Sequence, residues 1–350
     1  MSGGDGKLLA VVEHWLPRIE VAGIPSATAR EIIAAAGDWS GWLRAWSDAA
    51  DVHVQIATEA EARGRTVTAG EAWMRAAVCM HFGQFMAFED LAAKDAAAAR
   101  KCALYRRAAP LLVPRAELIE VPFERGSLRG YLRLPDAPGE YPLALIVPGS
   151  DSTKEEFCAL ERVFLDRGIA TFSLDGPGQG EGRSHGPLRP DLAPALDAAM
   201  AVLSGLPGLN GRTAVVGMAF GGHLAMAAAS RLAWPAAVVS INGFADLGAF
   251  CPALPEVYRD NLRFALGTDD VCGRAGDFTL AGLPGPACPA LILHGGRDRI
   301  FPVDQARAQA DACRGPRELR VFPEGNHVCN NIPWLYRPLV ADWLGEQMRG

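Results

Sequence analysis

The sequence predicts an α/β protein, in which a mostly parallel, doubly wound β-sheet follows a helical region. After about residue 115, helix-forming segments alternate with short apolar runs such as LALIVPG, IATFSLDG and ALILHGG. This alternation is typical of a parallel sheet that helices cover on both faces. Before Pro110, by contrast, only helical patterns occur. We therefore predict a helical domain followed by an α/β domain.

The helical domain is predicted over residues 1–112. Capping boxes occur in SATAREIIAAAGDW and TAGEAWMRAAVCMHFGQFMAF, where Thr28 and Thr68 are each followed three residues later by a glutamate. These two threonines predict the starts of two helices. A third helix is predicted in LAAKDAAAARKCALYRRAA, which is rich in strong helix formers and ends before Pro110.

The α/β domain is predicted over residues 113–350. Its first two strands, ELIEVPF and SLRGYLRLP, flank a short turn at Glu124–Gly126 and predict a β-hairpin. Residues 244–286 are rich in Gly, Pro and Asp and interrupt the alternation of strands and helices. We predict that this stretch is an insertion near the active site, over the ends of the strands.

Composition excludes several classes of protein. The 350 residues are 49% hydrophobic and carry a net charge of −6, which argues against a nucleic-acid or anionic-membrane partner. No apolar run approaches the roughly 18 residues of a membrane span, and the first residues lack the pattern of a signal peptide. The eight cysteines form no C-x-x-C pair, so we expect reduced thiols, no metal and no cofactor. The predicted location is the cytoplasm.

The stretch VGMAFGG, residues 216–222, predicts a sharp turn between a strand and a helix. It follows the apolar run RTAVV and precedes the helical HLAMAAASRL. Glycines at 217 and 221 flank Ala219 in the spacing G-x-S-x-G, the turn on which α/β-hydrolases present a nucleophilic serine. The position of the nucleophile is therefore predicted at Ala219, although alanine has no nucleophilic atom.

An acid and a histidine follow in the order that this chemistry needs. Asp298 comes after the apolar run ALILHGG, and His327 comes after the next predicted strand. A serine hydroxyl becomes nucleophilic when a histidine takes its proton, and a carboxylate holds that histidine in the required tautomer. Alone, each residue is also typical of a turn or a solvated loop. Together and in chain order with Ala219 they favour catalysis, with Asp269 or Asp270 as the alternative acid.

Backbone amides complete the predicted site. One donor of an oxyanion hole is expected at Phe220, and the other at Ser150 in the loop VPGSDSTKEE. Asp151, His81 and His223 are further candidates for contact with a small-molecule substrate, although His81 is more typical of a core residue and His223 fits a pocket or a packing role equally. The glycine-rich DGPGQGEG lacks the Lys-Ser/Thr of a phosphate-binding loop, so we expect it to shape the mouth of the site.

Residues 68–350 resemble the FrsA-like α/β-hydrolases, and within them most of all the 2,6-dihydroxypseudooxynicotine hydrolase group. The resemblance is carried by TAGEAWMRAAVCMHF, VPGSDSTKEEF, DGPGQGEG, VGMAFGG, INGFADL, LHGGRDRI and GNHVCNNIPWLYRPLVADWL. It implies the α/β-hydrolase fold, with an N-terminal helical domain that serves as a lid and in homodimer formation. It also implies hydrolysis of an ester, or of a C–C bond beside a ketone, in an aromatic or secondary-metabolite substrate.

The alanine at the turn departs from the pattern of the family and allows three interpretations. Ala219 can be an engineered replacement of a serine in a hydrolase. The chain can also be a natural relative that binds or reshapes a ligand without a nucleophile. Finally, it can be a cyclase or lyase that uses His327 and Asp298 for acid–base chemistry alone. We favour the first, because the flanking glycines, the acid, the histidine and the predicted amide donors all remain.

Overall fold

The structure, a computed structural model, describes residues 5–349, with side chains from residue 12 onward. The chain forms two compact units. One contains the chain up to Leu118 together with Glu155–Ala159, and the other contains Ile119–Lys154 and the chain from Leu160 onward. A five-residue piece of the loop after the third strand thus belongs to the helical unit. None of the described helices is both long and apolar enough to cross a membrane.

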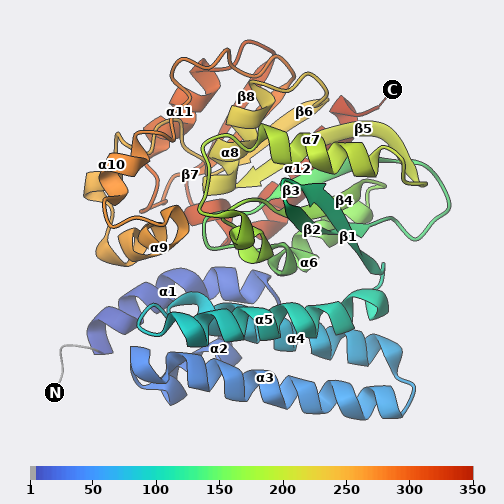
Figure 1. The fold of residues 1–350 in the computed structure, drawn as a ribbon, viewed down its shortest axis with the longest axis vertical. Helices are drawn as coiled ribbons and strands as arrows, with labels where there is room; N and C mark the ends of the chain where they lie inside the picture. Colours follow the sequence, from blue (N-terminus) through green and yellow to red (C-terminus); the bar gives the residue numbers. More distant parts are fainter. Residues whose placement is uncertain (1–4, 350) are drawn as a thin grey trace. The chain divides into compact units, whose positions relative to one another are not determined.

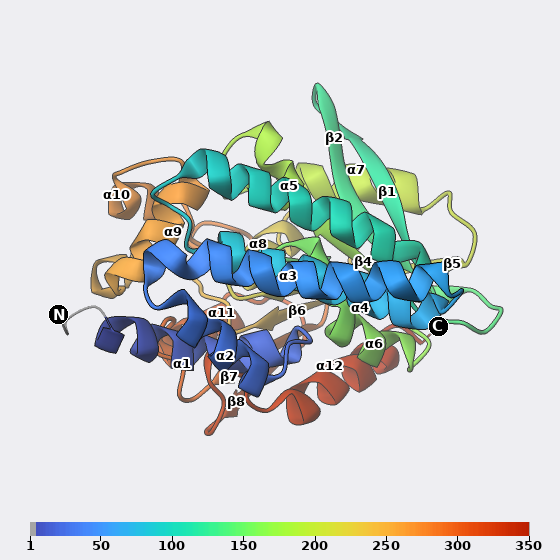
Figure 2. The same cartoon turned by 90° about the horizontal axis from the view of Figure 1, so that it is seen from below.

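The first unit is a bundle of helices (Figure 2). Its helices are α1 (Asp5–Val21), α2 (Ser26–Ala36), α3 (Trp39–Ala62), α4 (Thr66–Phe85), α5 (Leu91–Ala108) and η1 (Ala109–Leu111). The capping boxes misplaced two helix starts, because α2 and α4 each begin two residues before the predicted threonine. Pro25 precedes α2, and Arg65 precedes α4 without a side-chain cap. Neither Thr28 nor Thr68 is therefore the N-cap.

Helix α4 is the centre of this unit and packs along both α3 and α5. Nearly every side chain from Ala69 to Phe85 is buried. Tryptophans from α3 cover one side, where Trp46 lies 5.6 Å from the ring of Phe82 and the indole N–H of Trp42 donates to the Phe82 carbonyl at 2.8 Å. A helix that is apolar all round is expected in such a central position.

The second unit contains an eight-stranded sheet in the order β1-β2-β4-β3-β5-β6-β7-β8 (Figure 1). Its strands are β1 (Ala116–Phe123), β2 (Gly126–Arg133), β3 (Tyr141–Val147), β4 (Ala170–Asp175), β5 (Leu209–Met218), β6 (Ala237–Ile241), β7 (Ala290–Gly295) and β8 (Arg317–Phe322). Strand β2 is antiparallel to β4, whereas the pairs from β4 to β8 are parallel. The predicted fold class is confirmed.

Helices flank this sheet. They are α6 (Cys158–Leu165), α7 (Ala193–Leu203), α8 (Phe220–Ala229), α9 (Glu256–Leu266), α10 (Val271–Ala275), α11 (Val303–Asp311) and α12 (Pro333–Gln347), with short turns η2 (Lys154–Glu156), η3 (Gly180–His185), η4 (Cys251–Ala253) and η5 (His327–Cys329). Every residue of β4, β6 and β7 is buried, as expected for strands covered on both faces. Turn η4 and helices α9 and α10 occupy the stretch predicted as an insertion.

Strand register brings the ends of four strands to one edge of the sheet. Met218 at the end of β5 pairs with Ile241 of β6, and Ile241 pairs with Leu293 near the end of β7. On the other side of β5, Val147 at the end of β3 pairs with Gly217. In parallel α/β sheets, ligands bind beyond the carboxyl ends of the strands. The loops that follow these four strands are therefore the expected position of a ligand site.

Candidate active site

Ala219 occupies a strained turn between β5 and α8. Its backbone has φ 51° and ψ −118°, a region that residues with a side chain rarely adopt. The amide of Ala219 donates to the Ile241 carbonyl at 2.8 Å, and its carbonyl accepts from the Gly222 amide at 2.9 Å. These two hydrogen bonds stabilise the strained backbone conformation of Ala219. The turn has the strand–turn–helix form that the sequence predicted, and Ala219 is half-buried at its apex.

The two flanking glycines are required by close backbone packing. A Cβ atom on Gly217 would lie 2.0 Å from the Gly221 carbonyl oxygen. A Cβ atom on Gly221 would lie 2.2 Å from the Val147 oxygen and 2.3 Å from the Pro148 oxygen. Because all of these neighbours are backbone atoms, no side-chain rotation can make room for a methyl group.

Gly221→Ala is therefore expected to destabilise the protein by about 3 kcal/mol or more, since the β3 loop or the turn has to move. Gly345→Ala is the matched control, because this glycine lies in α12 with no atom within 4 Å of the added Cβ. There the replacement removes a helix-weakening residue and should stabilise by up to about 1 kcal/mol. Urea unfolding of both variants measures the difference, and equal midpoints would contradict the packing argument.

Asp298 and His327 are joined by a hydrogen bond. Asp298 follows β7, His327 begins η5 after β8, and the distance from His327 Nδ1 to Asp298 Oδ2 is 2.8 Å. The carboxylate has no solvent exposure, whereas 18% of the His327 side chain is exposed. With Nδ1 held by the carboxylate, Nε2 is the nitrogen that can accept a proton.

Asp298 remains ionised because its hydrogen bonds outweigh its burial. Burial alone would raise the pKa of Asp298, but His327, the Asn242 amide and the backbone of Ile300 together lower it to about 2. Oδ1 accepts from the Ile300 and Phe301 amides at 2.7 and 3.1 Å. A carboxylate with several such donors keeps its charge at neutral pH. It can therefore orient His327 and stabilise the imidazolium form.

Asn242 is a residue of this centre that sequence reasoning missed. It directly follows β6, has φ 50° and is fully buried. Its Nδ2 donates to Asp298 Oδ2 at 2.8 Å, so one carboxylate oxygen receives both Asn242 and His327. The signal that could have marked Asn242 is its positive φ, a conformation that Asn tolerates better than most residues. The letters INGF do not reveal that conformation.

The loop after β3 lies beside the turn. A Cβ atom on Gly149 would stand 3.6 Å from the Ala219 Cβ and 3.4 Å from the Met218 carbonyl oxygen. Ser150, the predicted amide donor, is the next residue and is half-buried. Phe220 is the first residue of α8, where an amide has no acceptor within its own helix. Both predicted donors thus belong to segments next to Ala219.

The glycine-rich stretch after β4 supports this loop. Gln179 is buried, and its Nε2 donates to the carbonyls of Pro148 and Gly149 at 2.5 and 3.2 Å. Its Oε1 accepts from the Gly176 amide at 3.0 Å. The stretch DGPGQGEG therefore braces the loop that contains Ser150, a more specific role than the shaping of a site mouth.

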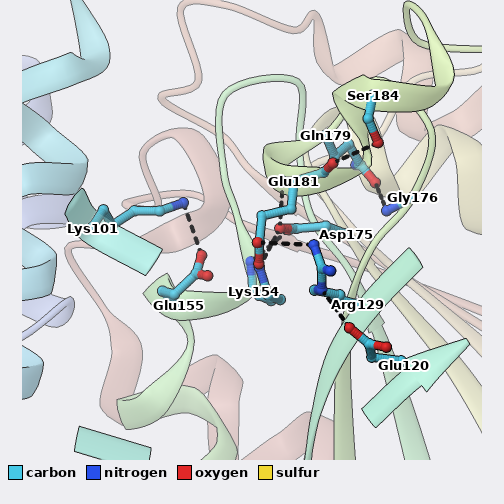
Figure 3. A network of polar contacts seen from close by, with 10 residues as sticks. All are labelled: Lys101, Glu120, Arg129, Lys154, Glu155, Asp175, Gly176, Gln179, Glu181 and Ser184. Carbon is cyan, nitrogen blue, oxygen red and sulfur yellow. Dashed lines mark hydrogen bonds and ion pairs between the residues drawn. The ribbon is translucent and has the colours of Figure 1, made fainter. Parts of the chain in front are cut away.

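A buried ionic network ties the far end of the same loop to the same stretch (Figure 3). Lys154 Nζ lies 2.7 Å from Asp175 Oδ2 and 2.8 Å from Glu181 Oε2, while the Lys154 amide donates to Asp175 Oδ1 at 2.9 Å. Arg129 Nη1 reaches the other oxygen of Glu181 at 3.3 Å. Lys154 and Asp175 have no solvent exposure. The loop is thus fixed by Gln179 at one end and by Lys154 at the other.

The remaining predicted substrate contacts lie in different surroundings. His223 is fully buried, donates from Nδ1 to the Phe244 carbonyl at 3.0 Å and stacks on the Phe244 ring at 4.5 Å. Burial lowers the pKa of His223 to about 4. His81 belongs to the helical unit, where it is buried 3.2 Å from Glu156. Asp151 is half-buried and accepts from Asn261 at 2.8 Å. Substrate contact stays a prediction for all three.

The sheet, its flanking helices and the loops at its carboxyl edge define an α/β-hydrolase. The profile of the esterase FrsA-like family matches residues 27–282. The 2,6-dihydropseudooxynicotine hydrolase of Paenarthrobacter nicotinovorans is 32% identical over 320 residues, which cover 87% of this chain and 83% of that protein. The chain belongs to the esterase FrsA-like family.

Two further relatives support this assignment. The crystal structure of a 2,6-dihydroxy-pseudo-oxynicotine hydrolase has a TM-score of 0.85 to this structure, at 28% identity and with 95% of each chain covered. The α/β hydrolase pydG of an Acremonium species is 32% identical over 229 residues, 61% of this chain and 54% of that protein. The alignment therefore spans about half the length of this fungal relative.

Proposed function

We propose that the chain is a serine-type hydrolase of small molecules in which alanine replaces the nucleophile at position 219. The observation that carries this proposal is the 2.8 Å bond between His327 and Asp298, in a chain that also has a strained turn of the kind that presents a nucleophile. With alanine at position 219, the chain binds its substrate and hydrolyses it only slowly, because no side-chain oxygen is available at the turn.

With a serine at the turn, the steps follow from the residues present. His327 Nε2 takes the hydroxyl proton while the oxygen attacks the substrate carbonyl, and the Phe220 and Ser150 amides donate to the resulting oxyanion. Collapse breaks the bond to the leaving group, which receives the proton from His327. Water then repeats the sequence and releases the acyl group. Asp298 stays ionised throughout and stabilises the imidazolium.

The substrate we propose is an ester, or a compound with a C–C bond beside a ketone, of aromatic or secondary-metabolite type. This follows from the relatedness to a 2,6-dihydropseudooxynicotine hydrolase. The test is to incubate the Ala219→Ser variant with aryl esters and with aryl 1,3-diketones, and to identify products by mass spectrometry. We expect cleavage of at least one class, with the Ala219→Ser, His327→Ala variant as the inactive control. Failure on both classes would contradict the proposal.

A second candidate function uses His327 as a general base without a covalent intermediate. It is favoured by one observation, that the hydrogen-bonded pair of Asp298 and His327 is present in a chain whose turn carries an alanine. Elimination or cyclisation by proton transfer needs only such a pair and an oxyanion site. The chain as written would then transform its ligand at a rate that His327→Ala abolishes and Ala219→Ser does not increase. The codon at position 219 in the source gene separates the two functions further.

We also propose a homodimer that acts in the cytoplasm, on the basis of the family resemblance and of the eight free thiols. Light scattering coupled to gel filtration tests the first point. A mass of about twice the 37.2 kDa of one chain is expected. A monomer at micromolar concentration would contradict the proposed dimer and leave the proposed chemistry unaffected.

A further inference from the structure

Two thiols meet in the segment that joins β6 to β7. Cys251 lies in η4, Cys272 lies in α10, and their Sγ atoms are 2.6 Å apart although 21 residues separate them in the chain. The sulfurs of a disulfide lie about 2.05 Å apart, so a displacement of about half an ångström separates the thiols from the bonded state. Cys251 is buried, whereas Cys272 is exposed.

We propose that Cys251 and Cys272 are a redox modification site, at which a peroxide converts the two thiols into a reversible disulfide. This goes beyond the sequence prediction of reduced, isolated cysteines. Reagents from solution reach Cys272, and a partner thiol is already in contact with it. Reactive cysteines of this type combine an accessible sulfur with a neighbouring resolving cysteine.

The chemistry balances with hydrogen peroxide as the oxidant. The Cys272 thiolate attacks one peroxide oxygen, which breaks the O–O bond and gives a sulfenic acid and hydroxide. Cys251 sulfur then attacks the Cys272 sulfur and displaces its oxygen, which leaves as water with the Cys251 proton. Overall two thiols and one peroxide give one disulfide and two waters. Burial and the neighbouring Cys272 raise the pKa of Cys251 to about 12, which makes Cys272 the first sulfur to react.

The disulfide would close a covalent ring of residues 251–272, which contains α9, the helix labelled next to α10 in Figure 1. Helix α9 carries Asn261, whose Nδ2 donates at 2.8 Å to Asp151, the residue after Ser150. At the start of the ring, Phe250 precedes Cys251 and packs 5.4 Å from the ring of Phe301. Phe301 in turn lies 5.1 Å from the His327 ring. Oxidation therefore restrains a segment that contacts the proposed oxyanion loop through Asn261 and is linked to the proposed base only through Phe250 and Phe301. This last step rests on the proposed function.

The chemical test needs no substrate. The full chain is treated with hydrogen peroxide, quenched with iodoacetamide and digested with trypsin without reduction. We expect a cross-linked species of residues 232–259 with 264–274, lighter than the two peptides together by the mass of two hydrogens and split by dithiothreitol. Cys272→Ser should abolish it, and Cys288→Ser, at a half-buried cysteine elsewhere, should leave it unchanged. A sulfinic acid or an adduct on Cys272 with Cys251 still a free thiol would overturn the proposal.

The structural consequence has its own readouts. Hydrogen exchange of the α9 amides should become about tenfold slower in the oxidised chain, because a cross-link opposes local opening. Fluorophosphonate labelling of the Ala219→Ser variant should change at least about threefold on oxidation, and Cys272→Ser should remove that change. If the cross-link forms while labelling stays constant, the effect on the site is refuted. If labelling fails in both redox states, the proposed function fails and the modification site stands.

Discussion

Ala219→Ser is expected to raise kcat/KM for a small activated ester, such as p-nitrophenyl acetate, by about 10³-fold or more over the chain as written. Removal of the nucleophile from a serine protease costs about 10⁶ in rate, and the reverse change restores less when the ester is not the natural substrate. The gain is expected because Asp298 already holds His327 through a 2.8 Å bond. Steady-state release of p-nitrophenol measures it.

Two further variants separate catalysis by the triad from a merely reactive serine. In the serine background, His327→Ala should return kcat/KM to the level of the chain as written. Asp298→Asn should lower it by about 10²–10⁴, because the amide favours the wrong tautomer of His327. An ester hydrolysis that survives both changes would show that the serine works without this pair, and the proposed site would then be wrong.

Lys154→Met is expected to destabilise the α/β unit by about 3–5 kcal/mol. The change leaves the buried Asp175 carboxylate without its cation, which is the costly way to break a buried ion pair. Among the residues that the structure describes, Asp175 would retain the backbone amides of residues 154 and 181 as donors. Urea unfolding followed by circular dichroism measures the loss. In addition, the loop with Ser150 should become more susceptible to proteolysis, because Lys154 fixes its far end.

The controls for Lys154→Met use a surface pair and a charge-matched double variant. Arg162→Met breaks an exposed i,i+4 pair with Asp166 and should change stability by less than about 0.5 kcal/mol. Lys154→Met combined with Asp175→Asn removes the stranded charge and should recover about 1 kcal/mol or more of the loss. A loss for Lys154→Met as small as that for Arg162→Met would contradict the assigned role of the network.

The sequence predicted what depends on local patterns. Short apolar runs with helical segments between them predict the parallel sheet, because strands buried on both faces need continuous apolar runs. The turn at Ala219 was visible because its flanking glycines are required, since a Cβ atom added to either would lie 2.0–2.3 Å from backbone oxygens. Asp298 could be proposed as the acid because it follows an apolar strand and stands between Ala219 and His327 in the chain order of this fold.

What the sequence could not predict depends on contacts between distant segments. Lys154 and Asp175 are 21 residues apart, one at the start of η2 and the other at the end of β4, and nothing in STKEE or SLDG marks them as partners. Gln179 supports the Ser150 loop by donating to two backbone carbonyls. Because every residue has a backbone carbonyl, the sequence does not identify these acceptors. The helix starts at Thr28 and Thr68 were misplaced because the first helical backbone bonds form earlier, from the Ala29 amide to the Pro25 carbonyl and from the Ala69 amide to the Arg65 carbonyl.

Covalent labelling of the Ala219→Ser variant with a fluorophosphonate tests the central claim most directly. The claim is that His327 and Asp298 form a hydrolase site that lacks only its nucleophile. We predict a single labelled tryptic peptide, residues 213–231, that is absent from the chain as written and lost again when His327→Ala is added. No label on that peptide, or a label that persists without His327, would contradict the claim.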